Sequence, residues 1–172
     1  MASKSEAQKA AMADVRAGKP RQEVFATYQS QVSPEKHLAF SIASVADPER
    51  FKQGAKLNNI LFGLLVFAAI TKAITALMMG SFFMLLLGLF VPVVFAIGVR
   101  KVDGQVYPLL MLVAGVGALH SLLQMGDAGA WMLLDVALLG AIGWLAFQMQ
   151  RIVFPNINWF KVRQDAQGNY VW

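Results

Sequence analysis

Three ionisable side chains interrupt a long apolar stretch of this 172-residue chain, namely Lys72, His120 and Asp135. An ammonium, an imidazole and a carboxylate can form an ion pair with a hydrogen-bonded neighbour, or they can relay protons or ions. A lysine can also extend its flexible stem alone to a polar boundary. The ion pair would be structural and the relay functional. The residue types alone are compatible with the ion pair, the relay and the extended lysine.

The sequence around these residues is that of a membrane protein. Apolar residues make up 57% of the chain and charged residues 15%, and the mean hydropathy is +0.53. Soluble domains carry about 25% charged residues and about 45 to 50% apolar ones. Between Asn58 and Gln150 the charged residues are Lys72, Arg100, Lys101, Asp103, Asp127 and Asp135. Because backbone polar groups in lipid must be paired within their own segment, this region is expected to be all α-helical.

Three polar or turn-forming sites divide the apolar region, at residues 79–81, 100–105 and 126–129. A membrane-spanning helix needs about 20 residues. The predicted spans are 59–79, 81–99, 106–125 and 130–150. We therefore expect an all-α membrane protein with a four-helix transmembrane bundle over residues 58–150. A short helical N-terminal arm, 1–57, precedes the bundle, and a small C-terminal tail, 151–172, follows it.

The basic residues predict the orientation of the chain. Nine lysines and arginines precede Asn58, two lie at Arg100 and Lys101, and three follow Gln150, whereas the other two connections contain none. Cytoplasmic segments of membrane proteins carry an excess of lysine and arginine. We therefore expect a multi-pass protein of the bacterial inner (cytoplasmic) membrane, with the N and C termini in the cytoplasm.

This orientation brings the three ionisable residues to one depth. Lys72 lies about seven residues before the outer end of its span, and His120 about five before the end of its own. Asp135 lies about five to seven residues after an outer start. A rise of 1.5 Å per residue then places all three ~7 to 10 Å below the outer surface. The main expectation is an ion pair between Lys72 and Asp135, with His120 as its hydrogen-bond partner.

The N-terminal arm combines helix starts with apolar faces. Pro20, Ser33-Pro34-Glu35 and Asp47-Pro48-Glu49 begin three predicted helices, the last of which continues into the first span. Residues 3–17 have little apolar face and are expected to be helical but partly disordered. The apolar faces must be buried against each other, on the membrane or on a partner protein. The candidate partner or interface contacts are Phe25, Tyr28, Leu38, Ile42, Trp159 and Phe160.

The C-terminal tail predicts a β-hairpin. Alternating apolar and polar residues at 159–163 and 169–172 flank a turn at residues 165–168, in which Gly168 can adopt a left-handed conformation. A lone hairpin is marginal in water, so it is expected to lie on the arm or in the lipid headgroup region.

Several kinds of chemistry have no support in the sequence. The chain has no cysteine and only two histidines, His37 and His120, which provides neither a thiolate site nor a zinc site of standard composition. No phosphate-binding loop, metalloprotease spacing or nucleophile elbow is present. The basic residues are mixed with acidic ones and form no dense patch. We expect no enzymatic activity, no metal or cofactor, and no nucleic-acid partner.

What remains is a non-enzymatic protein that contacts membrane lipid and binds a partner protein through its arms or its lipid-facing helices. The layout of four short spans with tiny outer loops and cytoplasmic arms resembles that of many small bacterial inner-membrane proteins. These include immunity proteins that neutralise pore-forming toxins, so the resemblance, which is one of architecture, implies immunity as an alternative. A small transporter or channel using the Lys72, His120 and Asp135 cluster is a further alternative. A homo-oligomer is compatible with each of these.

Overall fold

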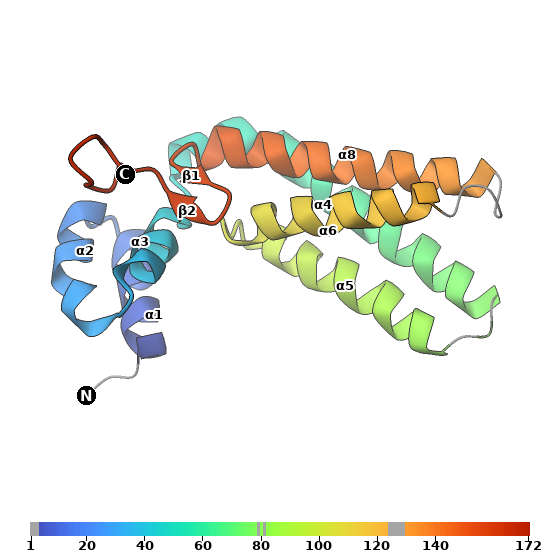
Figure 1. Ribbon diagram of the computed structural model, residues 1–172, viewed down its shortest axis with the longest axis horizontal. Helices are drawn as coiled ribbons and strands as arrows, with labels where there is room; N and C mark the ends of the chain where they lie inside the picture. The colour runs from blue at the N-terminus through green and yellow to red at the C-terminus, as the bar shows by residue number, and fades with distance from the viewer. Residues whose placement is uncertain (1–3, 79, 81, 124–129) are drawn as a thin grey trace.

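The structure is a computed structural model that describes residues 4–78, 80, 82–123 and 130–172. Its elements, in chain order, are α1 (Lys4–Arg16), α2 (Arg21–Tyr28), the short 3-10 helix η1 (Gln29–Gln31), α3 (Glu35–Ala43), α4 (Pro48–Met78), α5 (Phe82–Arg100), α6 (Val106–Leu123), α8 (Ala130–Val153), β1 (Ile157–Asn158) and β2 (Lys161–Val162). Figure 1 shows α4, α5, α6 and α8 running lengthwise, with α1 to α3 and the tail gathered at one end.

Three helices of the described residues are long and apolar enough to cross a membrane, namely α4, α6 and residues Met132–Val153 of α8. The remaining predicted span, 81–99, corresponds to α5, of which Gly88–Arg100 forms a shorter apolar helix. The membrane protein expected from the sequence is therefore confirmed, whereas the four-helix transmembrane bundle stays a prediction. The predicted span ends at residues 79, 81 and 125, and the predicted connection at residues 126–129, lie outside the described residues.

Helix α4 begins where the sequence predicted and is the longest element of the structure. The Asp47 side chain accepts hydrogen bonds from the backbone N–H groups of Glu49, at 2.9 Å, and Arg50, at 3.3 Å, which caps the helix. From Pro48 the helix runs without a break for 31 residues to Met78, a length of about 46 Å. One rigid element therefore joins the arm to the far end of the apolar helices.

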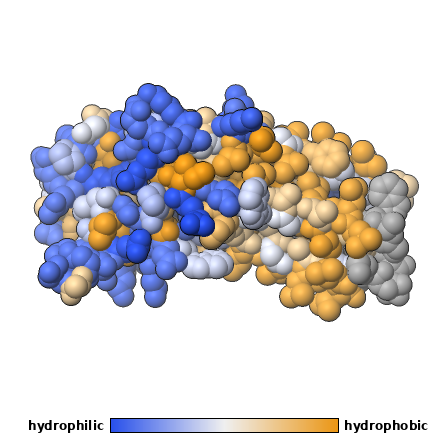
Figure 2. Space-filling view, turned by 90° about the horizontal axis from the view of Figure 1, so that it is seen from above, coloured by the Kyte–Doolittle hydropathy of each residue, from blue (hydrophilic) through white to orange (hydrophobic). Residues whose placement is uncertain are grey.

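The apolar helices pack on one another through small residues. Helix α4 packs against both α5 and α8, and α6 packs against α8. A Cβ atom added at Gly54 would lie 2.9 Å from Val153 and 3.1 Å from Met149, so α4 and α8 approach closely there. The sides that face away from the helix contacts remain apolar, and Figure 2 shows this apolar surface over the half of the molecule opposite the polar arm. Such a surface suits lipid.

A buried polar network joins three of these helices near the arm. Asn58 of α4 is 4% exposed and Tyr107 of α6 is fully buried. The Tyr107 hydroxyl donates to Asn58 Oδ1 at 2.7 Å, and Asn58 Nδ2 donates to the backbone oxygen of Val99, in α5, at 3.1 Å. Each polar group therefore has a partner, and the network fixes the rotation of the three helices relative to one another.

The arm folds on itself rather than presenting its apolar faces. Helices α1, α2 and α3 pack around a core of Ala7, Ala11, Val24, Val32, Leu38 and Ile42. The expectation that residues 3–17 are partly disordered is wrong for the part described, because α1 is a continuous helix from Lys4 to Arg16. Its narrow apolar face is sufficient because Ala7 and Ala11 lie one turn apart and let the partner helices approach closely.

The arm is docked on the connection between α5 and α6. Gly104 N donates to the backbone oxygen of Ser44 at 3.0 Å, and Val45 forms an isolated bridge with Asp103. Arg21 extends from α2 and donates to the backbone oxygen of Val45 at 2.7 Å. A Cβ atom at Gly104 would lie 2.8 Å from Ser44 Cα, so glycine is required for this close backbone contact.

The tail also packs on the arm, as expected, but its strands differ from the prediction. Strands β1 and β2 pair around a turn that contains Trp159, whose φ is +56°, so Trp159 lies in a turn and not in a strand. The predicted turn at residues 165–168 is present, with Gly168 at φ +85°, but it is flanked only by an isolated bridge between Gln164 and Tyr170. Two short reversals therefore replace one longer hairpin.

Candidate functional site

Lys72 and Asp135 form the ion pair that the depth arithmetic predicted. Lys72 Nζ lies 2.6 Å from Asp135 Oδ1, which joins α4 to α8. The second carboxylate oxygen, Oδ2, accepts a hydrogen bond of 2.6 Å from the Ser121 hydroxyl of α6. The Asp135 side chain is 18% exposed and that of Lys72 40%. Both carboxylate oxygens therefore have donors, and the pair is charge-compensated within an otherwise apolar region.

The close packing of the helices positions this pair. A Cβ atom added at Gly88 of α5 would lie 3.1 Å from Lys72 Cβ, so the backbone of α5 limits where the stem of Lys72 can go. Ser121, on α6, is 5% exposed, and its hydroxyl reaches across to Asp135 on α8. The neighbouring hydroxyls of Thr71 and Thr75 donate instead to backbone oxygens of their own helix, each at 3.0 Å. The polar centre described here is thus Lys72, Asp135 and Ser121.

His120 precedes Ser121 on α6, and its side chain is exposed. We expected His120 to supply a hydrogen bond to the ion pair. The structure shows such a bond from Ser121, the next residue along the helix. The role of His120 as a hydrogen-bond partner, and that of the whole cluster in moving protons or ions, stay predictions.

The predicted partner contacts fall into two groups. Leu38 and Ile42 are fully buried in the arm core and present no surface to another molecule in this fold. Phe25 and Tyr28 are partly buried: Phe25 packs edge-on against Tyr170, with ring centroids 5.2 Å apart, and Tyr28 donates a hydrogen bond to Asp14. Trp159 and Phe160 remain 55% and 49% exposed. Of the six residues, these two are the most available to a partner.

A polar groove that the sequence did not reveal lies between α1, α3, the connection at Gln105 and the tail. We call it the arm groove. Its volume is about 740 Å³. It is lined by Ser5, Gln8, Lys9, Met12, Lys36, His37, Phe40, Ser41, Gln105, Phe160, Lys161, Val162, Gln164 and Tyr170. These residues come from segments far apart in the chain, so no local sequence motif predicts the groove.

Charge in the arm helps to hold the helix that forms one wall of this groove. Asp14 of α1 contacts Lys19 Nζ at 3.0 Å and accepts a hydrogen bond of 3.1 Å from the Tyr28 hydroxyl of α2. The hydrogen bond from Lys19 lowers the pKa of Asp14, and that from Tyr28 lowers it further. The same bond to Asp14 raises the pKa of Tyr28. The ionised carboxylate therefore links α1 to α2.

The fold and these sites define an α-helical membrane protein with a polar domain at one end of its apolar helices. No family model, curated protein or solved structure matches the chain.

Proposed function

We propose that this protein is a multi-pass inner-membrane protein that acts without catalysis, by binding an acidic segment of a partner protein in the arm groove on the cytoplasmic side. In this proposal α4, α5, α6 and α8 are the four spans. The length of α5, 19 residues, and its packing along α4 support its assignment as a span. The observation that carries the proposal is the charge of the groove.

The arm groove combines positive charge with patches of apolar surface. Three lysines, Lys9, Lys36 and Lys161, lie along it with exposed side chains. Among the described residues that line the groove, none is acidic. Met12, Phe40 and Phe160 supply apolar surface between the lysines. A peptide with carboxylates interspersed with aliphatic or aromatic residues complements both features.

The distribution of the basic residues supports a cytoplasmic placement of the groove. The arm, the connection at Arg100 and Lys101, and the tail lie together at one end of the molecule (Figure 1). These three segments hold all the lysines and arginines except Lys72. The positive-inside rule assigns that end to the cytoplasm.

The orientation makes a direct prediction. An alkaline phosphatase fused after Trp172 should be inactive, because it folds only outside the cytoplasm, and a cytosolic fluorescent protein at the same position should be bright. The matched control places each reporter after Gly80, at the opposite end of α4 from the arm, where the pattern should reverse. An active phosphatase in the Trp172 fusion would refute the cytoplasmic C terminus.

The partner proposal is tested with charge-reversal variants of the full-length protein. The groove variant carries Lys9→Glu, Lys36→Glu and Lys161→Glu, and the matched control carries Lys4→Glu, Arg16→Glu and Lys52→Glu, three basic residues outside the groove lining. Proteins crosslinked to each variant in native membranes are identified, and the crosslinked segment is mapped. We expect an acidic segment that is retained by the control, is lost from the groove variant and dissociates as salt rises.

Two results would contradict the proposal. One is a partner list that is the same for the groove variant and for the wild type. The other is a crosslinked segment without acidic residues. Lys4, Arg16 and Lys52 are all exposed, and the ion pair between Lys52 and Glu49 lies on the surface, so the control variant should keep its stability.

A further inference from the structure

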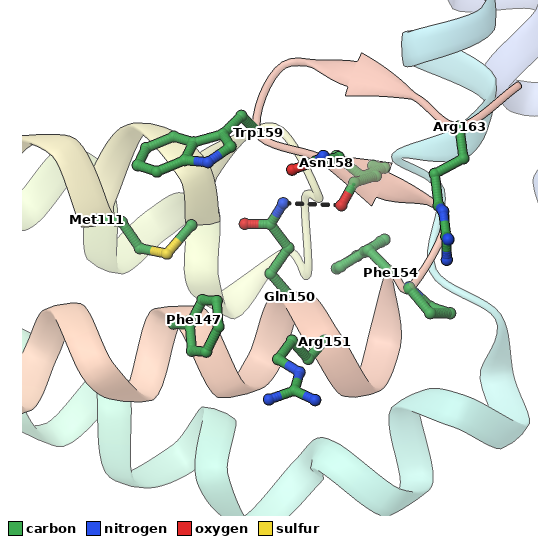
Figure 3. Close-up of a pocket in the computed structure, with 10 residues that line it drawn as sticks. Met111, Phe147, Gln150, Arg151, Phe154, Asn158, Trp159 and Arg163 are labelled. Carbon is green, nitrogen blue, oxygen red and sulfur yellow. Dashed lines mark hydrogen bonds between the residues drawn. The ribbon is translucent and has the colours of Figure 1, made fainter.

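A second pocket, of about 510 Å³, lies where α8 gives way to the tail (Figure 3). We call it the boundary pocket. Its lining changes in character from one side to the other. Met111 and Phe147 lie on the side toward the apolar helices, and Arg163 lies on the side toward the tail. Trp159, in the turn between β1 and β2, covers the top in this view. This gradient from apolar to basic is that of a membrane–water boundary.

The charge of the boundary pocket is positive and uncompensated. Arg151 and Arg163 both line it, with exposed side chains. Arg151 lies over the Phe147 ring, 5.6 Å from its centroid. Among the described residues, neither arginine has a carboxylate within ion-pair distance, and no acidic residue lines the pocket. Two arginines on the lining of one pocket favour an anion with several acceptor oxygens, such as a phosphate.

Gln150 provides the second, independent observation. This residue lines the pocket and is only 5% exposed. Its Nε2 donates to the backbone oxygen of Ile157 at 3.1 Å, which fixes the orientation of the amide. Among the described residues, its Oε1 is a buried acceptor that lacks a hydrogen-bond donor. In Figure 3 this oxygen points toward the space between Met111 and Trp159. Because buried acceptors are nearly always paired, a donor is missing from this position.

We propose that the boundary pocket binds an anionic phospholipid whose headgroup carries a hydroxyl, with phosphatidylglycerol as the chemical type. The long, exposed side chains of Arg151 and Arg163 turn toward the phosphodiester, and a headgroup hydroxyl donates to Gln150 Oε1. The acyl chains follow the apolar side, past Phe147. An ethanolamine headgroup also offers a donor, but its ammonium would face the two arginines. This inference rests on the membrane placement proposed above and is independent of the partner in the arm groove.

The test uses the full-length protein in detergent, with retained lipids measured by native mass spectrometry and titration. Phosphatidylglycerol is compared with phosphatidylmethanol, which has the same charge but no headgroup hydroxyl, and with phosphatidylcholine. We expect the order phosphatidylglycerol, phosphatidylmethanol, phosphatidylcholine, from tightest to weakest. Soluble glycerol phosphate, which lacks acyl chains, should not compete at equal concentration. Effective competition by glycerol phosphate would assign the pocket to a free phosphate compound and overturn the lipid proposal.

Variants separate the two halves of the site. Arg151→Gln with Arg163→Gln should weaken phosphatidylglycerol binding about 30-fold, whereas Lys52→Gln with Lys56→Gln, an equal loss of charge on α4, should not change it. Gln150→Met should bind phosphatidylglycerol and phosphatidylmethanol equally while keeping its preference for both over phosphatidylcholine. Thermal unfolding without lipid verifies that each variant is folded. The site would be overturned by unchanged lipid binding in the arginine variant, or by equal binding of all three lipids to the wild type. Neither result bears on the partner proposed for the arm groove.

Discussion

Asp135→Leu is expected to destabilise the protein by about 3 kcal/mol, because it leaves the Lys72 ammonium without its partner in an apolar region. This value is at the lower end of the range for buried pairs, since the Lys72 side chain keeps 40% of its surface exposed. Lys72→Met alone leaves the Asp135 carboxylate with the Ser121 hydroxyl as its hydrogen-bond donor among the described residues. The double variant, Lys72→Met with Asp135→Leu, removes both charges and should be more stable than Asp135→Leu alone.

Thermal or denaturant unfolding in a fixed detergent ranks these variants. Their free energies form a double-mutant cycle, in which a pair that interacts gives a double variant less destabilised than the sum of the single ones. Ser121→Ala is the matched control, because it removes one hydrogen bond to Asp135 without removing a charge, and it should cost about 1.5 to 3 kcal/mol. Strictly additive losses for Lys72 and Asp135 would show that the two residues do not stabilise each other.

Tyr107→Phe is expected to lower the free energy of unfolding by about 1 to 3 kcal/mol. The phenylalanine ring fills the same space, but Asn58 Oδ1 then remains buried without the donor that lies 2.7 Å away in the wild type. The loss arises from an unpaired polar atom and not from a cavity. Unfolding in detergent, monitored under the conditions used for the ion-pair variants, measures it.

The control for this prediction is another tyrosine. Tyr170 packs against Phe25, and its hydroxyl makes no side-chain hydrogen bond with a described residue. Tyr170→Phe should therefore change stability by no more than about 0.5 kcal/mol. Equal stability of the Tyr107→Phe and Tyr170→Phe proteins would show that the Asn58 network contributes nothing measurable.

The features that could be predicted from the sequence are those that depend on distance along a helix axis. The cap at Asp47 is a local signal, and α4 begins there. Lys72 and Asp135 could be paired from the sequence because helical rise converts residue number into depth, once the orientation is assumed. Depth does not give the rotation of a helix about its own axis. For that reason the sequence predicted His120 as the hydrogen-bond partner of the ion pair and did not identify Ser121, the next residue, as a donor to Asp135.

The features that were missed depend on contacts between distant segments. Asn58 marked only the edge of a span in the sequence, yet it is paired with Tyr107, 49 positions further along the chain. The turn at Trp159 requires a positive φ from a residue that rarely adopts one, so no turn motif predicts it. The arm groove and the boundary pocket are likewise assembled from several segments. Composition and periodicity describe each segment by itself and contain no information on which segments meet.

The packing of the tail on the arm also sets an order of biosynthesis. Phe25 precedes every apolar helix along the chain, whereas Tyr170 and Trp172, whose rings pack against it at centroid distances of 5.2 and 5.6 Å, follow all of them. The arm helices precede the apolar helices along the chain, but this aromatic cluster cannot form until the tail that follows α8 has reached the arm. The aromatic cluster therefore forms only after the apolar helices have been synthesised, and until then the ring of Phe25 lacks Tyr170 and Trp172 as packing partners.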